Sequence, residues 1–292
     1  MPRWGVGLLA VAVVAVGLLA WWGTRSPAGG DDANGSGVRP IARIESTDIH
    51  ALLIDSTNAD TVRFGSHAGI QESRDGGYTW KTGSLKNADA MSLASSPQDA
   101  ATLYAAGHNV FQVSRDGGAT WQAVQHNLPG TDIHAFAQDP SEPKRLYAFV
   151  VGAGLLASQD GGTRWDPVPT QPPGGSPHAL ASSGADLYAP TSSGLAVSRN
   201  QGATWDQLAT PPGGIGSLAI PASDPLTMYA GTPAGLARSV DGGQTWTTAG
   251  PAGVPVLALA AAPSDPLRVL FVAAGGDVYR SDDGGASWLA PK

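Results

Sequence analysis

The octet SRDGGATW at residues 114–121 is one of six related octets that run along the chain. All six have serine first, glycine fifth and tryptophan last. Their third positions follow one another at intervals of 41, 44, 40, 41 and 42 residues. A repeat of about 42 residues with strand-like content predicts a β-propeller or a solenoid. The octets, called boxes below, are SRDGGYTW (73–80), SRDGGATW (114–121), SQDGGTRW (158–165), SRNQGATW (198–205), SVDGGQTW (239–246) and SDDGGASW (281–288).

Each repeat carries the signals of four short strands. In the third repeat an apolar run, HAFAQ (134–138), precedes the turn DPSEP (139–143). A second run contains an aromatic residue, a third leads into the box, and a fourth starts at the box tryptophan. This pattern is typical of a propeller blade. The sequence therefore predicts an all-β fold, a six-bladed β-propeller of four-stranded antiparallel blades.

The aromatic residue of the second run recurs twelve or thirteen residues before the third position of the box. We expect these side chains in the core, because buried aromatic rings contribute large apolar areas. Arginine takes this place in the first repeat, where it either reaches the channel or pairs with a nearby carboxylate. The positions are Arg63, Tyr104, Tyr147, Tyr188, Tyr229 and Phe271.

The octet resembles the Asp-box, or BNR repeat, of sialidases, the sortilin family, some glucan hydrolases and a photosystem II assembly factor. The resemblance covers residues 41–292. It implies that each box lies on the outer rim between the third and fourth strands, away from the ligand face. The resemblance is compatible with a glycosyl hydrolase. The central arginines and the Arg-Ile-Pro motif of sialidases, however, are not evident. The third positions are therefore interpreted as structural: Asp75, Asp116, Asp160, Asn200, Asp241 and Asp283.

Composition excludes several function classes. The formal net charge of −7 disfavours a nucleic-acid partner. The absence of cysteine removes disulfides, thiolate metal sites and cysteine nucleophiles.

The N-terminal segment predicts export. Residues 4–22, WGVGLLAVAVVAVGLLAWW, contain no charged side chain, and 19 residues are about enough to span a bilayer as a helix. We expect residues 1–22 to be a transmembrane helix, residues 23–40 a flexible linker, and residues 41–292 a propeller outside the cytoplasm, anchored in the cytoplasmic membrane. The alternative is a cleaved signal segment and a secreted protein.

Histidines and aspartates gather at one end of the predicted propeller. We call the face at which the first strand of each blade starts the top face; the turns between second and third strands lie there too. The string TDIHA occurs at 47–51 and 131–135, so the same Asp-His pair recurs at equivalent places in the first and third blades. Residues two apart in a strand point to the same side. The top-face candidates are Asp48, Asp89 and Asp132 as catalytic residues; His50, His67, His108, His134, His178 and Arg63 as ligand-binding residues; and His50, His134, His178, Asp48 and Asp132 as metal ligands.

Three functions remain open. The first is a binding module that recognises a protein or a glycan through the top face, and binding is preferred to catalysis. The second is a glycoside hydrolase that uses a pair of top-face aspartates. The third is a divalent-metal site built from the Asp-His pairs, the one cofactor that the sequence suggests.

Ring closure has one candidate. The last repeat ends at residue 292, only four residues after its box tryptophan, so its fourth strand is very short. Residues 39–46, RPIARIES, precede the first inner strand and can pair beside the last blade, which would cover an exposed edge.

Overall fold

A computed structural model describes residues 37–46 and 48–292. The predicted transmembrane helix and most of the predicted linker lie outside these residues. Within them, no helix is both long enough and apolar enough to cross a bilayer.

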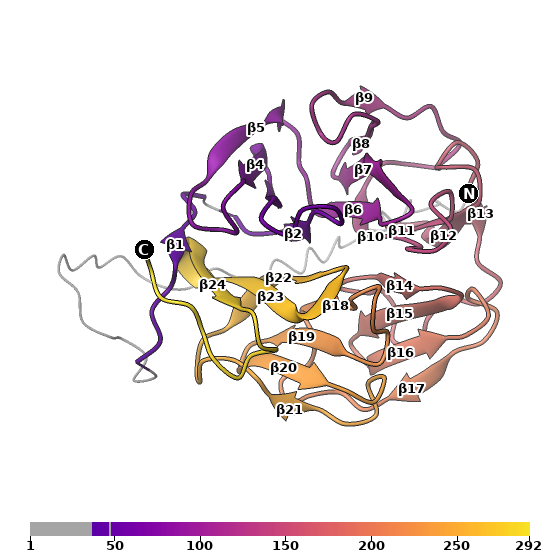
Figure 1. Cartoon of the computed structure of the whole chain (residues 1–292). Helices are drawn as coiled ribbons and strands as arrows, with labels where there is room; N and C mark the ends of the chain where they lie inside the picture. Colours follow the sequence, from indigo (N-terminus) through magenta and orange to yellow (C-terminus); the bar gives the residue numbers. More distant parts are fainter. Residues whose placement is uncertain (1–36, 47) are drawn as a thin grey trace, which may run out of the picture. The chain divides into compact units, whose positions relative to one another are not determined.

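Six four-stranded antiparallel sheets make up the described chain, as Figure 1 shows. The predicted six-bladed propeller is therefore confirmed. Blades one to five each take four consecutive strands, paired in chain order. The first three blades are β2 (Ala51–Ile54), β3 (Val62–Ser66), β4 (Gly69–Ser73) and β5 (Lys81–Lys86); β6 (Ser92–Ser96), β7 (Asp99–Gly107), β8 (Val110–Ser114) and β9 (Gln122–Ala123); and β10 (Ile133–Gln138), β11 (Leu146–Val150), β12 (Gly154–Ser158) and β13 (Asp166–Pro167).

The second half of the ring repeats this order. The fourth and fifth blades are β14 (Ala181–Ser183), β15 (Asp186–Thr191), β16 (Gly194–Ser198) and β17 (Asp206–Leu208); and β18 (Ser217–Ala219), β19 (Met228–Thr232), β20 (Gly235–Ser239) and β21 (Thr247–Thr248). The sixth blade contains β22 (Val256–Ala262), β23 (Asp265–Ala273) and β24 (Asp277–Ser281), with a 3-10 turn, η1 (Ala274–Gly276), between the last two.

The outer strand of the sixth blade comes from the N-terminal end of the described chain. Strand β1 (Ala42–Arg43) pairs antiparallel with β24, with Ala42 opposite Val278. Ile44 extends this contact by donating its N–H to the carbonyl of Gly276 at 2.8 Å. The predicted closure by residues 39–46 is confirmed, and the chain after the last box contributes no strand of its own. Figure 1 shows β1 beside β24.

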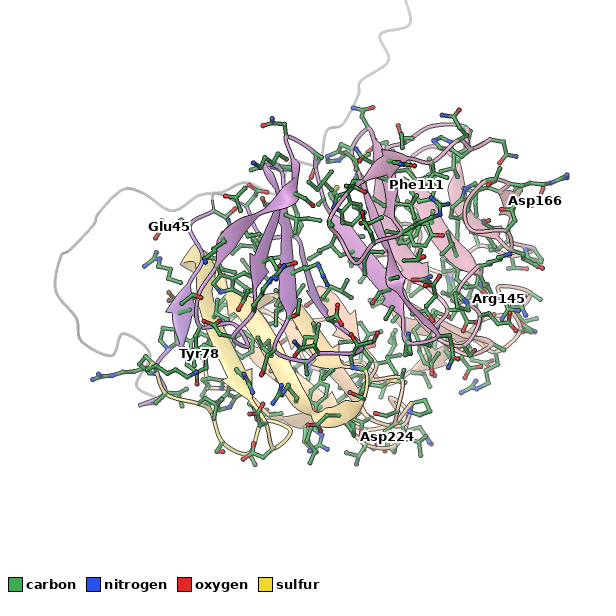
Figure 2. All side chains as sticks on the ribbon, turned by 45° about the horizontal axis from the view of Figure 1, so that its top comes forward. Glu45, Tyr78, Phe111, Arg145, Asp166 and Asp224 are labelled. Carbon is green, nitrogen blue, oxygen red and sulfur yellow. The ribbon has the colours of Figure 1, made fainter. Side chains whose placement is uncertain are left out.

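The core lies between neighbouring blades. The five aromatic residues of the second strands are all buried, as predicted. Phe111 of β8 belongs to one such cluster and contacts Trp165 of the next blade with ring centroids 5.8 Å apart. Figure 2 labels Phe111 among the blades and Asp166, which points outward from the rim. The six innermost strands line a central cavity of about 160 Å³.

Each box is closed by hydrogen bonds to the residue at its third position. In the second box Asp116 Oδ1 accepts hydrogen bonds from Ser114 Oγ at 2.7 Å and from the Thr120 N–H at 2.8 Å. These bonds lower the pKa of Asp116 to about 2, the Thr120 hydroxyl contributing most. The fourth box keeps the same turn although it departs from the pattern. There Asn200 Oδ1 accepts from the Thr204 N–H at 2.8 Å, and Gln201 takes the left-handed φ of 58°.

Candidate metal centre

Seven side chains of the first three blades form a continuous row on the top face. Each aspartate comes from the segment that leads into an inner strand. Two of the histidines lie at the start of inner strands, and two lie in turns between second and third strands. We call this set the histidine–aspartate row; its members are Asp48, His50, His67, Asp89, His108, Asp132 and His134.

Acid and imidazole alternate along the row. His67 of the β3–β4 turn places Nδ1 at 3.3 Å from Asp48 Oδ2 and Nε2 at 3.5 Å from Asp89 Oδ2. His108 of the β7–β8 turn places Nδ1 at 2.6 Å from Asp89 Oδ2 and Nε2 at 3.3 Å from Asp132 Oδ1. Each turn histidine therefore joins the aspartate of its own blade to the aspartate of the next blade.

The two TDIHA strings close the ends of the row. His50 Nε2 lies 3.2 Å from Asp48 Oδ2, and His134 Nε2 lies 3.1 Å from Asp132 Oδ1. The structure thus brings together both Asp-His pairs proposed from the sequence. Asp89, whose own blade has Met91 in the histidine position, occupies the middle.

Backbone hydrogen bonds between blades explain the contacts along the row. They join the turn between the second and third strands of one blade to the segment that precedes the inner strand of the next blade, which we call its lead. Asn109 donates its N–H to the carbonyl of Thr131 at 2.8 Å, next to an antiparallel bridge between His108 and Asp132. Between the first and second blades, Ala90 donates its N–H to the carbonyl of Ser66 at 3.0 Å. Each turn is therefore tied to the lead of the following blade.

Three groups of ligand atoms along the row have the proximity that a metal ion requires. Within each group one donor atom per residue lies within 4.8 Å of the others. Neighbouring groups share a histidine. The groups are Asp48, His50 and His67; His67, Asp89 and His108; and His108, Asp132 and His134.

The row contains polar atoms that lack hydrogen bonds. His50 Nε2, Asp89 Oδ1 and Asp132 Oδ1 are inaccessible to solvent and have no hydrogen-bond partner among the described residues, although charged groups lie within ion-pair distance. Native proteins leave few such atoms, and each one suggests an ion or water that completes it. Burial, followed by the charge of His67, lowers the pKa of His50.

Two sequence-predicted site residues lie elsewhere. His178 is exposed at the lead of the fourth blade and is absent from the three groups. Arg63 is buried between the first two blades, where Nη1 lies 3.1 Å from Asp55 Oδ2 and Nη2 donates to the carbonyl of Gly117 at 2.8 Å. Of the two roles expected for Arg63, the structure therefore shows the pairing with a carboxylate.

A regular spacing in the sequence marks the two turn histidines, although it does not by itself predict them as metal ligands. His67 and His108 each lie eight residues before the third position of a box. The sequence predicts only ligand binding for them, because it does not reveal that these turns meet aspartates of the following blade.

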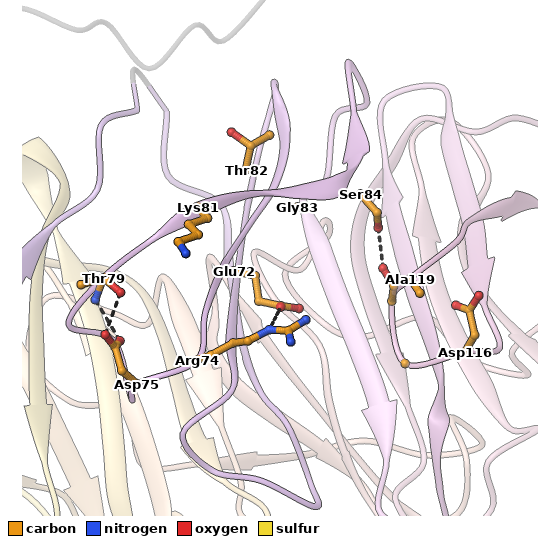
Figure 3. A pocket seen from close by; sticks show the side chains of 12 residues that line it. Glu72, Arg74, Asp75, Thr79, Lys81, Thr82, Gly83, Ser84, Asp116 and Ala119 are labelled. Carbon is orange, nitrogen blue, oxygen red and sulfur yellow. Dashed lines mark hydrogen bonds and ion pairs between the residues drawn. The ribbon is translucent and has the colours of Figure 1, made fainter.

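A larger hollow lies apart from the row. Strand β5 and the second box border a groove of about 600 Å³. Figure 3 shows Glu72 and Arg74 paired on one side of it, with Nε of Arg74 at 2.7 Å from Oε1 of Glu72. A similar hollow of about 570 Å³ borders the third and fourth boxes. Because the groove recurs with the box, we regard it as a consequence of the repeat and place the candidate site at the row.

The comparisons with known proteins bear on the fold. The family model described as BNR/Asp-box repeat matches residues 112–123, which include the second box. The chain carries a BNR/Asp-box repeat. No curated protein matches it significantly in sequence.

Several solved structures superpose on this chain. The GH74 xyloglucanase from Xanthomonas campestris superposes with a TM-score of 0.59 at 20% identity, over 86% of this chain and 46% of the enzyme, so this chain spans less than half of that protein. YCF48 from Cyanidioschyzon merolae superposes with a TM-score of 0.53 at 17% identity, over 87% of this chain and 86% of YCF48. A structure of YCF48 bound to D1 peptide gives a TM-score of 0.53 at 18% identity, over 85% of this chain and 83% of that one. At these identities the likeness concerns the fold.

Proposed function

We propose that this propeller binds a divalent transition-metal ion, zinc foremost, between its second and third blades. The ligands are His108, Asp132 and His134. The observation that supports this most directly is the triangle formed by their donor atoms. Its sides are 3.2 Å between the two Nε2 atoms, 3.1 Å from His134 Nε2 to Asp132 Oδ1, and 3.3 Å from His108 Nε2 to Asp132 Oδ1.

The triangle has the size of one face of a zinc tetrahedron. Zinc binds imidazole nitrogen and carboxylate oxygen at roughly 2.0–2.2 Å, so tetrahedral ligand atoms lie about 3.3–3.5 Å apart. The three measured sides fall short of this by no more than a few tenths of an ångström. An ion just above the triangle would therefore reach all three atoms with little movement of the side chains.

The carboxylate behind His108 supports the same metal site. His108 Nδ1 lies 2.6 Å from Asp89 Oδ2; in the tautomer that donates Nδ1–H to this carboxylate, the Nε2 lone pair faces Asp132 and His134. A carboxylate behind a ligating histidine fixes its tautomer and raises its basicity. Asp89 would serve as such a partner.

The ligand types select the class of ion. Two imidazoles and one carboxylate suit zinc, copper or nickel, whereas calcium and magnesium prefer oxygen-only shells. The three side chains are between 41% and 49% exposed, and three protein ligands leave a fourth position open to water or to a partner's oxygen. This open position would let the ion take part in recognition.

Recognition of a protein or glycan by the top face, the preferred prediction from the sequence, is compatible with this proposal. The structure of YCF48 with a peptide is an example of a propeller of similar fold with a bound peptide. Glycoside hydrolysis by Asp48, Asp89 or Asp132 stays a prediction, and Asp89→Asn is the variant that would test it with polymeric glycans.

We further propose that the propeller works outside the cytoplasm, held by the apolar segment at residues 4–22. Its support is the length of this charge-free run. Protease protection of the chain in membrane vesicles of known orientation tests the placement.

Metal uptake tests the function. The full chain, purified without a polyhistidine tag and stripped with chelator, is titrated with Co²⁺ and Zn²⁺ and assayed by elemental mass spectrometry. We expect tight zinc binding and the visible absorption of tetrahedral Co²⁺. His134→Ala should weaken binding by more than roughly 10- to 100-fold, the loss that is typical when a residue hydrogen-bonded to a metal ligand is removed. His178→Ala, which removes a top-face histidine outside the row, is the matched control. A wild-type chain that takes up no metal contradicts the proposal.

A further inference from the structure

The other end of the row repeats the same chemistry. His50 Nε2 and His67 Nδ1 approach one carboxylate oxygen, Asp48 Oδ2, at 3.2 Å and 3.3 Å. The His50 and Asp48 side chains are only 19% and 16% exposed, so this end lies deeper than the first. His50 Nε2 is inaccessible to solvent and lacks a hydrogen bond, which marks an unmet ligand at this end.

The two ends can be filled at the same time. The middle group uses His67 and His108, each of which also belongs to one of the end groups. An ion in the middle would take the nitrogens of these histidines that face Asp89, and each histidine would then have to bind two ions. The end groups share no residue, so both ends can be filled without a histidine that binds two ions.

Asp89 connects the two ends. Its Oδ2 atom lies 2.6 Å from His108 Nδ1 and 3.5 Å from His67 Nε2. In each histidine the nitrogen that faces Asp89 is the one remote from the adjacent end group. When the nitrogen that faces Asp89 carries the proton in each histidine, the other nitrogen has a lone pair directed at one end of the row. Its other oxygen, Oδ1, lies 3.8 Å from His50 Nε2.

We infer that the row holds two divalent transition-metal ions, one on Asp48, His50 and His67 and one on His108, Asp132 and His134, with the Asp89 carboxylate behind His67 in one site and behind His108 in the other. This inference rests on the proposed function. Charge supports it, because the three aspartates of the row offset most of the charge of two divalent ions. Removal of Asp89 then weakens both sites together, which no role confined to one site would do.

Stoichiometry separates the inference from the proposed function. The full, untagged chain is titrated with Zn²⁺ by calorimetry and with Co²⁺ by absorption. We expect two equivalents in the wild type, one in His134→Ala, one in His50→Ala and none in the double variant. Because His50 is largely buried, His67→Ala, whose side chain is 55% exposed, is a second route to the loss of the deeper site.

The outcomes are distinct. A wild-type stoichiometry of one, lost in His134→Ala and kept in both His50→Ala and His67→Ala, overturns the second site and leaves the proposed function standing. Absence of all binding overturns both. Asp89→Asn should retain two equivalents and weaken each by roughly 10- to 100-fold. Weakening of one site alone overturns the shared role of Asp89, and His178→Ala should change nothing.

Discussion

His108 Nε2 and His134 Nε2 lie 3.2 Å apart although the two residues belong to different blades. His108 lies in a turn of the second blade, and His134 lies in the inner strand of the third. A backbone bridge between His108 and Asp132 holds the turn against the strand lead. Two imidazole nitrogens this close need either a shared proton or a shared ion.

Metal binding should stabilise the propeller. An ion that binds only the folded state adds about 2.7 kcal/mol when its free concentration is 100 times its Kd. For a domain of this size that shifts Tm by roughly 5–10 °C. We expect Zn²⁺ to raise Tm by this order in the wild type and in His178→Ala, measured by calorimetry. The shift should shrink in His134→Ala; an equal shift in all three proteins would indicate binding outside the row.

Ring closure by β1 should contribute strongly to stability. Ile44 is 1% exposed and packs in the core between the first and last blades. Ile44→Ala should lower the free energy of unfolding by about 2–5 kcal/mol, because it leaves a cavity. Arg43→Ala, whose side chain is 61% exposed, should cost less than about 1 kcal/mol. Urea unfolding compares the two, and equal values would argue against a closing role for this segment.

The boxes should make the propeller sensitive to acid. Hydrogen bonds lower the pKa of Asp116, Asp241 and Asp283 to about 2, below the roughly 3.9 of an unfolded aspartate. The stabilisation is therefore complete above about pH 4 and is lost as the pH falls towards 2. Asp116→Asn should make the dependence of stability on pH shallower in this window. Asn200→Asp should make it steeper, and Tm measured from pH 2 to 7 tests both; unchanged slopes would contradict the assignment.

Arg63 should be required for the stability of the fold but not for metal binding. Its guanidinium lies 3.1 Å from Asp55 and 3.3 Å from Glu72, and its side chain is 5% exposed. Arg63→Met leaves the poorly solvated Asp55 carboxylate without its cation and removes one of the two cations beside Glu72, which should cost roughly 3–5 kcal/mol. Arg74→Ala removes an exposed partner of Glu72 and should have no measurable effect. Chemical denaturation and metal content are measured together, and loss of metal in a folded Arg63→Met would contradict this assignment.

Arg63 also shows how the repeat tolerates a change of chemistry. In the next blade the equivalent residue, Tyr104, donates its hydroxyl proton to the carbonyl of Gly161 at 3.2 Å. Arg63 donates to the carbonyl of Gly117 at 2.8 Å, the same position in the preceding box. Both side chains link a second strand to the box of the following blade. The sequence marked Arg63 as an exception, whereas the fold uses it for the same inter-blade contact.

The sequence by itself determined the fold and the local position of each candidate ligand. Box spacing fixed the number of blades, since each box is one turn between the same two strands. The alternation of strands placed TDIHA at the start of inner strands. Box spacing and strand order recur in every repeat of about 42 residues. Because each repeat is a short, continuous stretch of sequence, both can be recognised without knowing how the blades pack.

Only the tertiary structure decided which ligands meet. The alternation of Asp48, His67, Asp89, His108 and Asp132 depends on the stagger between neighbouring blades, set by backbone hydrogen bonds between a turn and the next lead. Sequence spacing carries no information about that stagger. His178, equivalent to His50 and His134 in the sequence, stands apart because the turn between β11 and β12 of the preceding blade has no histidine, and Ser176 takes the place of Asp48 and Asp132.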